Sequence, residues 1–217
     1  YAFLSNPNNY TYQIFGRPYQ GIGLAQYAFG SPEELGNPVV FYLFQGARIN
    51  QFNPFLSLNY EWNFGLSFGW KPYDSMFNPN NKIIGSKVNA YINTNVFLIW
   101  NLSRKLDLTT GITLSHFSNG NTKFPNKGLN TTGGKIGLVY NFNNKYNSVE
   151  KNVLTAFPEF PQHISYELVL FGSGCRTGVD FKDGQIASPE MYKVFGFNFS
   201  PMYSISYRFR AGASIDG

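Results

Sequence analysis

Hydrophobic and polar residues alternate with a period of two along much of the chain. Between Leu56 and Trp70 every even position is aliphatic or aromatic, and every odd position is small or polar. Successive side chains of a β-strand point to opposite faces, so the segment predicts a strand with one wholly apolar surface. At about 3.3 Å per residue its length is roughly 45–50 Å, which is long for a soluble protein.

The same alternation recurs and predicts further strands. They are expected near residues 21–29, 39–46, 56–70, 87–102, 106–118, 130–142, 163–172, 191–200 and 203–213. Two interpretations compete: a soluble β-sandwich with the apolar face inward, and a transmembrane barrel with the apolar face toward lipid. Aromatic residues near the strand ends of the apolar face favour the barrel, as do the Asn, Ser, Thr and Gly residues of the other face. These aromatic residues are Trp62, Trp70 and Trp100.

We therefore expect an all-β fold, a transmembrane antiparallel β-barrel of about 8–12 strands, with ten favoured. It would form a single outer-membrane domain over residues 1–217. Bacterial barrels normally have an even number of strands. Either Tyr10–Phe15 also pairs as a strand, or the chain is incomplete at its C-terminus.

The connections expected between the strands are short at one end and long at the other. Ser103–Lys105 predicts a tight turn, whereas residues 71–87, 119–129 and 173–190 predict long outer loops, as in outer-membrane barrels. Residues 47–54 and 143–162 form two connections at the end where short turns are expected, and both are longer than a short turn.

Composition narrows the class of protein further. Aromatic residues make up 18% and charged residues only 13% of the chain, which excludes intrinsic disorder. No apolar run approaches the roughly 18 residues of a transmembrane helix. Cys175 and the two widely separated His residues match no metal-binding pattern, so we expect no metal, cofactor or nucleic-acid partner. The net charge of +5 is modest and is compatible with an anionic partner.

Two polar residues lie on the apolar face where one strand reaches its outer end. His116 and Ser118 are two positions apart and share the face of Ile112 and Leu114. Asn130 occupies the same face of the next strand. Polar groups facing lipid are unfavourable unless paired. A His beside a Ser hydroxyl is the minimum for nucleophilic acyl transfer, since the imidazole can accept the hydroxyl proton.

The sequence here resembles the outer-membrane lipid A 3-O-deacylase (PagL) family. The resemblance rests on His116-Phe-Ser118-Asn119 and on the Pro-Asn-x-Gly loop ending at Gly128. It implies a small, acyloxyacyl-hydrolase-like β-barrel that removes the ester-linked acyl chain from the 3-position of lipid A. The specific match covers about residues 113–140, and this chain is longer than the eight-stranded members of the family.

The resemblance implies a role for each residue of the motif. Ser118 would be the nucleophile and His116 the general base, while the family's acidic position falls on Asn130. An amide can orient an imidazole, as in Cys-His-Asn enzymes, but it lacks the charge that stabilises imidazolium. We expect His116, Ser118 and Asn130 to be hydrogen-bonded to one another. The candidates for the oxyanion hole are Asn119, Gly120 and Asn126.

The leading hypothesis is therefore a Ser-His-Asn esterase of the Gram-negative outer membrane that acts on lipid A or a related lipid. Lys123 and Lys127 in the motif loop are candidates for binding lipid phosphate, although a solvated basic rim explains them equally well. An alternative is a weak or inactive barrel that docks a lipid, a membrane protein or a second copy of itself. A passive pore ranks last, because the predicted interior carries Glu61, Tyr91 and Phe97.

Overall fold

The computed structural model describes residues 2–4, 10–142, 159–181 and 184–217. The chain divides into two compact units, the first of Tyr1–Asn119 with Pro125–Val153, the second of Gly120–Phe124 with Leu154–Gly217. Within the described residues both units are built from antiparallel strands, with one short helix, α1 (Tyr10–Ile14). The predicted all-β fold is confirmed, whereas a single domain over residues 1–217 stays a prediction. No helix in these described ranges has the length and apolarity to cross a membrane.

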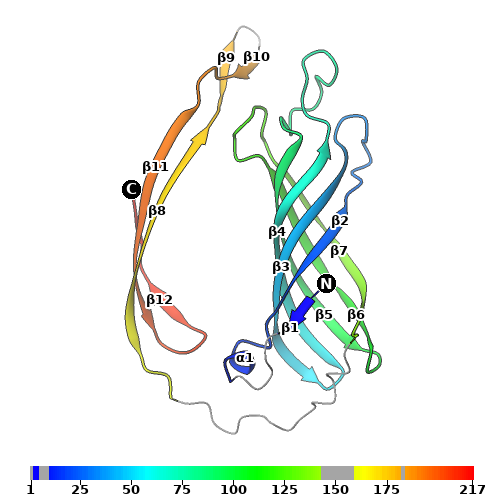
Figure 1. Ribbon diagram of the computed structural model, residues 1–217, viewed down its shortest axis with the longest axis vertical. Coiled ribbons are helices and arrows are strands. Elements are labelled where there is room, and N and C mark those ends of the chain that lie inside the picture. The colour runs from blue at the N-terminus through cyan, green and yellow to red at the C-terminus, as the bar shows by residue number, and fades with distance from the viewer. Residues whose placement is uncertain (1, 5–9, 143–158, 182–183) are drawn as a thin grey trace. The chain divides into compact units, whose positions relative to one another are not determined.

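The first unit is a seven-stranded antiparallel sheet in which each strand pairs with its neighbours along the chain (Figure 1). The order from one edge to the other is β1 to β7. The strands are β1 (Ala2–Leu4), β2 (Tyr19–Gln26), β3 (Gly36–Asn53), β4 (Leu56–Trp70), β5 (Val88–Asn101), β6 (Leu106–Ser118) and β7 (Leu129–Tyr140).

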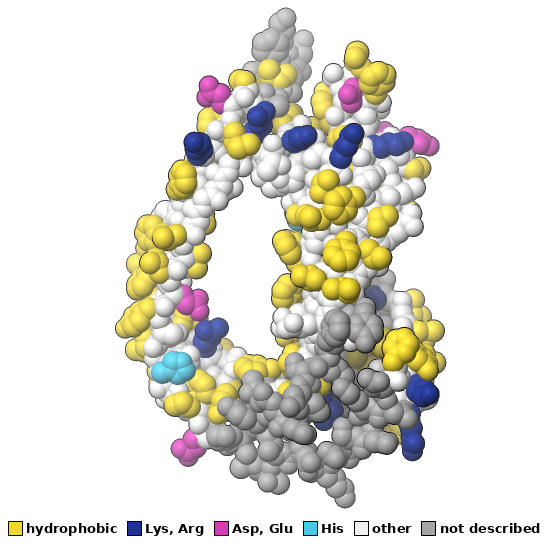
Figure 2. Space-filling model, viewed as in Figure 1, with side chains coloured by type: hydrophobic (Ala, Val, Ile, Leu, Met, Phe, Trp, Pro, Cys, Tyr) yellow, Lys and Arg dark blue, Asp and Glu magenta, His cyan; other side chains and the backbone are white. Residues whose placement is uncertain are grey.

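The alternation of the sequence is the alternation of burial in this sheet. Most polar side chains at odd positions of β4, β5 and β6 are buried, whereas most large apolar side chains at even positions are exposed. Figure 2 shows hydrophobic side chains over the outer surface of the strands. The buried polar set includes Asn59, Asn63, Ser67, Asn89, Asn93, Asn95, Thr109 and Ser115. The exposed apolar set includes Phe64, Leu66, Phe68, Ile92, Val96, Ile112 and Leu114.

The sheet curls strongly around its polar face. Tyr27 directly follows β2, yet its hydroxyl lies 2.9 Å from the Tyr91 hydroxyl on β5 and 3.1 Å from Ser115 Oγ on β6. In a flat sheet, four strand spacings of about 4.8 Å would place β2 and β6 roughly 19 Å apart. These contacts are possible only because the polar face is concave.

Hydrogen bonds and an ion pair fill the concave face. Glu61 on β4 accepts a hydrogen bond from the Tyr19 hydroxyl at 3.0 Å and lies 3.4 Å from Lys135 Nζ on β7. The same Lys135 ammonium lies over the Phe97 ring, 4.6 Å from its centroid. Glu61 and Phe97 therefore face the interior, as their parity predicts. The ion pair links strands three positions apart in the sheet, which requires the same curvature.

Trp70 departs from the predicted parity. The alternation places it on the apolar outer face, but its side chain is buried and its indole N–H donates a hydrogen bond to Ser67 Oγ at 2.8 Å. The cause is Gly69, whose φ of 90° lies in a region that favours glycine. The pairing of β3 with β4 is irregular at the same level, between Gly36 and Val39. This local break in the strand geometry turns Trp70 inward.

Three other expectations for the first unit can be compared with the structure. The alternative in which Tyr10–Phe15 pairs as a strand is wrong, because this segment is mostly helical in α1 (Tyr10–Ile14). Residues 47–54 are largely the extension of β3 to Asn53, where bulges keep the chain paired with β4, rather than a long connection. Ser103–Lys105 is confirmed as a tight turn, closed by the Ser103 N–H donating to the Leu106 carbonyl at 3.0 Å. The connection predicted over residues 143–162 lies mostly outside the described residues.

The second unit is organised around one long antiparallel hairpin. Strand β8 (His163–Cys175) pairs along its whole length with β11 (Tyr192–Ser204). The predicted loop over residues 173–190 contains a smaller hairpin of β9 (Gly178–Phe181) and β10 (Gly184–Ala187). Two short strands, β12 (Arg210–Gly212) and β13 (Ile215–Asp216), also pair with β11.

The predicted strand over residues 203–213 is wrong in its middle part. The chain turns back between β11 and β12, and the Ile205 N–H donates to the Phe209 carbonyl at 3.0 Å. Ser206 stabilises the turn, because its hydroxyl accepts a hydrogen bond from the Phe209 N–H at 3.2 Å. Ser is a frequent turn residue for this reason, and its local bond overrides the alternation of the surrounding aromatic residues.

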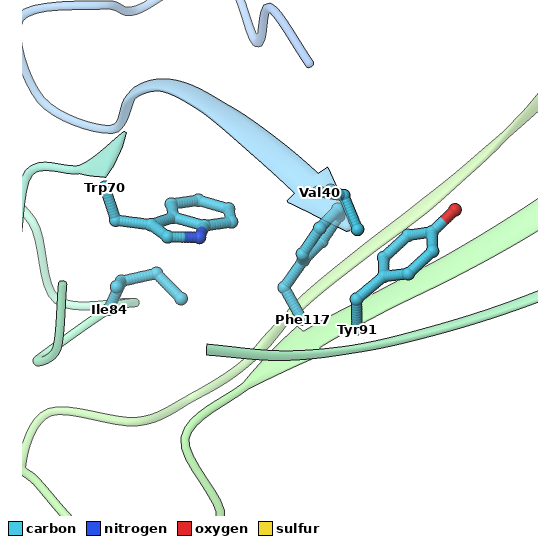
Figure 3. Close-up of a cluster of buried hydrophobic side chains, with 5 residues drawn as sticks. All are labelled: Val40, Trp70, Ile84, Tyr91 and Phe117. Atoms are coloured by element: carbon cyan, nitrogen blue, oxygen red, sulfur yellow. The ribbon is translucent and has the colours of Figure 1, made fainter. Parts of the chain in front are cut away.

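An aromatic cluster closes the core of the first unit at its loop end. Phe117 is fully buried and lies between Trp70 and Tyr91, with ring centroids 5.1 and 5.2 Å away (Figure 3). Ile84 and Val40 complete the cluster, and neither is exposed. Edge-to-face and tilted ring contacts of this kind add to the free energy gained by burial. The cluster therefore fixes the last residues of β6.

Replacing Phe117 with Ala removes the centre of this cluster. We expect the free energy of unfolding to fall by about 3–5 kcal/mol, because the variant loses both the buried area and the packing around it. Urea denaturation in lipid vesicles, followed by tryptophan fluorescence, measures the change. Phe77→Ala is the matched control, since Phe77 is 86% exposed, and its effect should stay within about 0.5 kcal/mol. Equal losses in the two variants would contradict the role of the cluster.

Candidate functional site

The outer end of β6 carries the residues singled out from the sequence. Phe117 points into the aromatic cluster, so its neighbours His116 and Ser118 lie on the opposite, outer face of the sheet. Both are half-buried. Exposed Ile112 and Leu114 continue the same face along the strand. The structure therefore places an imidazole and a hydroxyl at the end of an apolar surface.

His116 is held by the neighbouring strand. It pairs with Asn130 of β7 in the sheet register, and its Nδ1 lies 2.7 Å from Asn130 Oδ1. An amide oxygen only accepts hydrogen bonds, so His116 Nδ1–H is the donor. This bond leaves Nε2 unprotonated in the neutral ring, which is the form that a general base needs.

Ser118 is the remaining member of the expected triad. It pairs with Ala90 of β5, so a small side chain lies on that flank. Within the described residues its hydroxyl makes no hydrogen bond, and of the expected contacts only the one between His116 and Asn130 is formed. Residues i and i+2 on one face of a strand are about 6.5–7 Å apart at their Cα atoms. Catalytic hydrogen bonds of this kind often tighten only when substrate binds.

Gly128 provides the space for the imidazole. Its φ is 71°, and a Cβ built on it would lie 3.0 Å from His116 Cε1 and 3.3 Å from the Phe117 carbonyl oxygen. A side chain at this position would therefore press on the ring as well as strain the backbone. The glycine that ends the Pro-Asn-x-Gly loop thus lies directly against the candidate base.

Asn126 organises the loop between β6 and β7. Its Oδ1 accepts a hydrogen bond from the Asn119 backbone N–H at 3.0 Å, and its backbone forms an isolated β-bridge with Ile84. This bond fixes the backbone of Asn119, the residue that follows Ser118. Gly120 has a φ of 63° and belongs to the segment that groups with the second compact unit. The oxyanion roles of all three residues stay predictions.

Basic side chains border the same loops. Lys127 is exposed, and its backbone N–H donates to the Ile83 carbonyl at 3.2 Å. Lys123 lies in the segment Gly120–Phe124 of the second unit. Figure 2 shows Lys and Arg side chains near the loop end of the first unit. The exposed lysines of the loop between β4 and β5 are Lys71, Lys82 and Lys87.

The charges of the loop between β4 and β5 also include a carboxylate with a perturbed pKa. Asp74 accepts hydrogen bonds from the backbone N–H groups of Phe77 and Met76, each at 2.9 Å, and these bonds lower its pKa below the usual value. In the described part of the chain, no three His, Cys, Asp or Glu side chains come together as a possible metal site.

Three residues near the site were not assigned a role from the sequence. Sequence parity places Trp70 on the outer face, Ile84 belongs to a predicted loop, and Gly128 enters only as part of a motif. A positive φ at Gly69 and Gly128 is the reason for two of these differences, and a glycine at a strand end is the available signal in both cases. Burial of Ile84 had no local signal, because it depends on packing against residues distant in the sequence.

Comparison with protein families gives two matches. A model of the family described as lipid A 3-O-deacylase (PagL) matches residues 7–139, and one described as the acyloxyacyl hydrolase C-terminal domain matches residues 164–217. No curated protein and no solved structure matched the chain. The first match spans more than half of the chain and includes the outward-facing His116, Ser118 and Asn130. The chain therefore belongs to the lipid A 3-O-deacylase (PagL) family.

Proposed function

We propose that the chain is an outer-membrane β-barrel esterase of Gram-negative bacteria that hydrolyses the ester-linked acyl chain at the 3-position of lipid A. The observation that carries the proposal is the bond between His116 Nδ1 and Asn130 Oδ1 on the apolar face, beside Ser118. Membership of the family supports the substrate class and the reaction. An ester buried in a bilayer can reach a nucleophile on this face without leaving the lipid.

The proposed reaction uses a covalent intermediate. Ser118 Oγ attacks the carbonyl carbon of the ester while His116 Nε2 accepts the hydroxyl proton. The tetrahedral intermediate collapses, the bond to the sugar oxygen breaks, and His116 returns the proton to that oxygen. Water then attacks the acyl-Ser118 ester, with His116 again as the base, and releases the fatty acid.

In the proposed mechanism, Asn130 orients the imidazole but limits the rate of the chemical step. It holds the imidazole in the tautomer with Nδ1 protonated, as an orienting residue must. It carries no charge, so it stabilises the imidazolium of the transition state less than the acidic residue expected from the family pattern. We therefore propose an active enzyme whose chemical step is slower than that of a Ser-His-acid triad.

Lipid phosphate provides a second element of recognition in the proposal. Lys127, Lys71, Lys82 and Lys87 are exposed in loops of the first unit, and ammonium groups attract phosphate as point charges. Lys123 completes the candidate set. The exposed apolar residues of the strands would contact the acyl chains, because apolar surface of this extent favours lipid over water.

Docking without catalysis is the second candidate function, and Asn130 is the observation that favours it. In this case the same face would bind a lipid, a membrane protein or a second copy of the chain. An acyl-enzyme distinguishes the two, since only an esterase becomes acylated at Ser118 when it is mixed with lipid A.

Loss of the nucleophile or the base should abolish hydrolysis. We expect Ser118→Ala and His116→Ala each to lower the rate of fatty-acid release from purified lipid A by about 10³-fold or more, because the members of a triad act as a unit. Mass spectrometry of the lipid measures the release. Ser115→Ala is the matched control on the same strand, since Ser115 faces the interior, and its rate should remain near wild type. Unchanged release by either site variant would refute the assignment.

Asn130 should control the rate through its bond to the imidazole. We expect Asn130→Ala to lower kcat by roughly 10–100-fold, the equivalent of one hydrogen bond to a charging group. Asn130→Glu should raise kcat above wild type, because a carboxylate stabilises imidazolium more strongly than an amide does. Steady-state assays in detergent micelles give both values. If Asn130→Ala had wild-type activity, the residue would have no orienting role.

A further inference from the structure

The loop between β4 and β5 contains a buried amide that the proposed reaction does not use. Asn81 is only 2% exposed, although it lies in a loop of the outer end. Its Nδ2 donates to the Lys71 carbonyl at 2.7 Å and to the Glu34 carbonyl at 3.1 Å. Its Oδ1 accepts from the backbone N–H groups of Ile83 and Ile84, both at 3.1 Å. A buried polar side chain with this many partners fixes the backbone segments that it joins.

The segment held by Asn81 contacts the loop of the candidate site directly. Ile84 forms an isolated antiparallel bridge with Asn126, and the Lys127 N–H donates to the Ile83 carbonyl at 3.2 Å. The Ile84 side chain is fully buried in the aromatic cluster with Phe117. The two loops thus share backbone hydrogen bonds as well as a hydrophobic core.

The loop that contains Asn126 contacts the residue after Ser118 and also the His116 ring. Asn126 Oδ1 holds the backbone N–H of Asn119, the residue after Ser118. Two residues further along, Gly128 lies against the His116 ring. A displacement of this loop would therefore shift the position of the nucleophile relative to its base, and such misplacement by about 1 Å can lower a rate about 10²-fold.

We propose that Asn81 is a positioning residue for catalysis, because it fixes Ile83 and Ile84 and through them the loop that holds Asn119 and packs Gly128 on His116. The inference rests on the proposed esterase function. Asn81 touches neither the substrate nor the reacting atoms in this scheme. It acts through the β4–β5 loop, by the backbone bonds of Ile83 and Ile84 and by the packing of the Ile84 side chain.

The test combines two measurements on Asn81→Ala in detergent micelles. Amide hydrogen exchange should become roughly tenfold faster at Asn119 and Lys127. Exchange in the N-terminal half of β6, away from the candidate site, should stay unchanged. The kcat for lipid A should fall roughly ten- to a hundredfold. KM should rise only a few-fold, because Lys71 and Lys127, two candidates for binding lipid phosphate, lie on the segments that Asn81 holds. The matched control is Asn59→Ala, since Asn59 is also buried, and within the described ranges its side chain bonds only to Ser57 of its own strand. It should change neither measurement at the site.

The outcomes separate this inference from the proposed function. Unchanged exchange in Asn81→Ala overturns the inference, and so does faster exchange with wild-type kcat. If the wild-type protein releases no fatty acid from lipid A, the esterase proposal fails, and exchange alone decides whether Asn81 holds the loop. Should Asn81→Ala not fold, Ile84→Val removes one methyl group from the same connection and should give the same two changes at smaller size. A wild-type result for that variant also counts against the inference.

Discussion

The opposite orientation of neighbouring side chains at the end of β6 is the constraint on which the rest of the site depends. Phe117 cannot leave the aromatic cluster without exposing a large apolar surface and opening a cavity. While it stays there, strand geometry directs His116 and Ser118 away from the interior. Packing on the inner side of the sheet therefore turns both side chains of the candidate site to the outer side, and the bond to Asn130 then orients the His116 ring.

Much of this arrangement follows from the sequence. The period-two pattern correctly predicted the long strands β4, β5 and β6, their two faces and the common outer face of His116, Ser118 and Asn130. These features are local or depend only on parity. The pairing of His116 with Asn130 is expected from the family resemblance. The pattern failed where glycine or serine changes the backbone locally, at Gly69 before Trp70 and at the turn around Ser206. It also could not give the contacts of Ile84 and Asn81, which depend on how distant loops pack.

The interior of the first unit and its outer face differ in the kind of side chain that they carry. Inside, the ion pair between Glu61 and Lys135 and the amide of Asn93 link strands through polar bonds. Asn93 Nδ2, for example, donates to Thr113 Oγ1 at 2.7 Å. Polar groups so enclosed are stable because nearly all of them are paired. The outer face carries mostly apolar side chains, with the polar side chains of His116, Ser118 and Asn130 at its end, so it could contact both a hydrocarbon chain and an ester.

The outward direction of His116 and Ser118 also has a kinetic consequence. In the proposed outer-membrane esterase, an amphiphile would reach them by two-dimensional diffusion within a leaflet, and the released chain would depart by the same lateral route. Turnover in such a system follows the mole fraction of substrate in the surface instead of its bulk concentration. Diluting the lipid with an inert amphiphile at constant total concentration would therefore slow the reaction, while adding buffer would leave it unchanged.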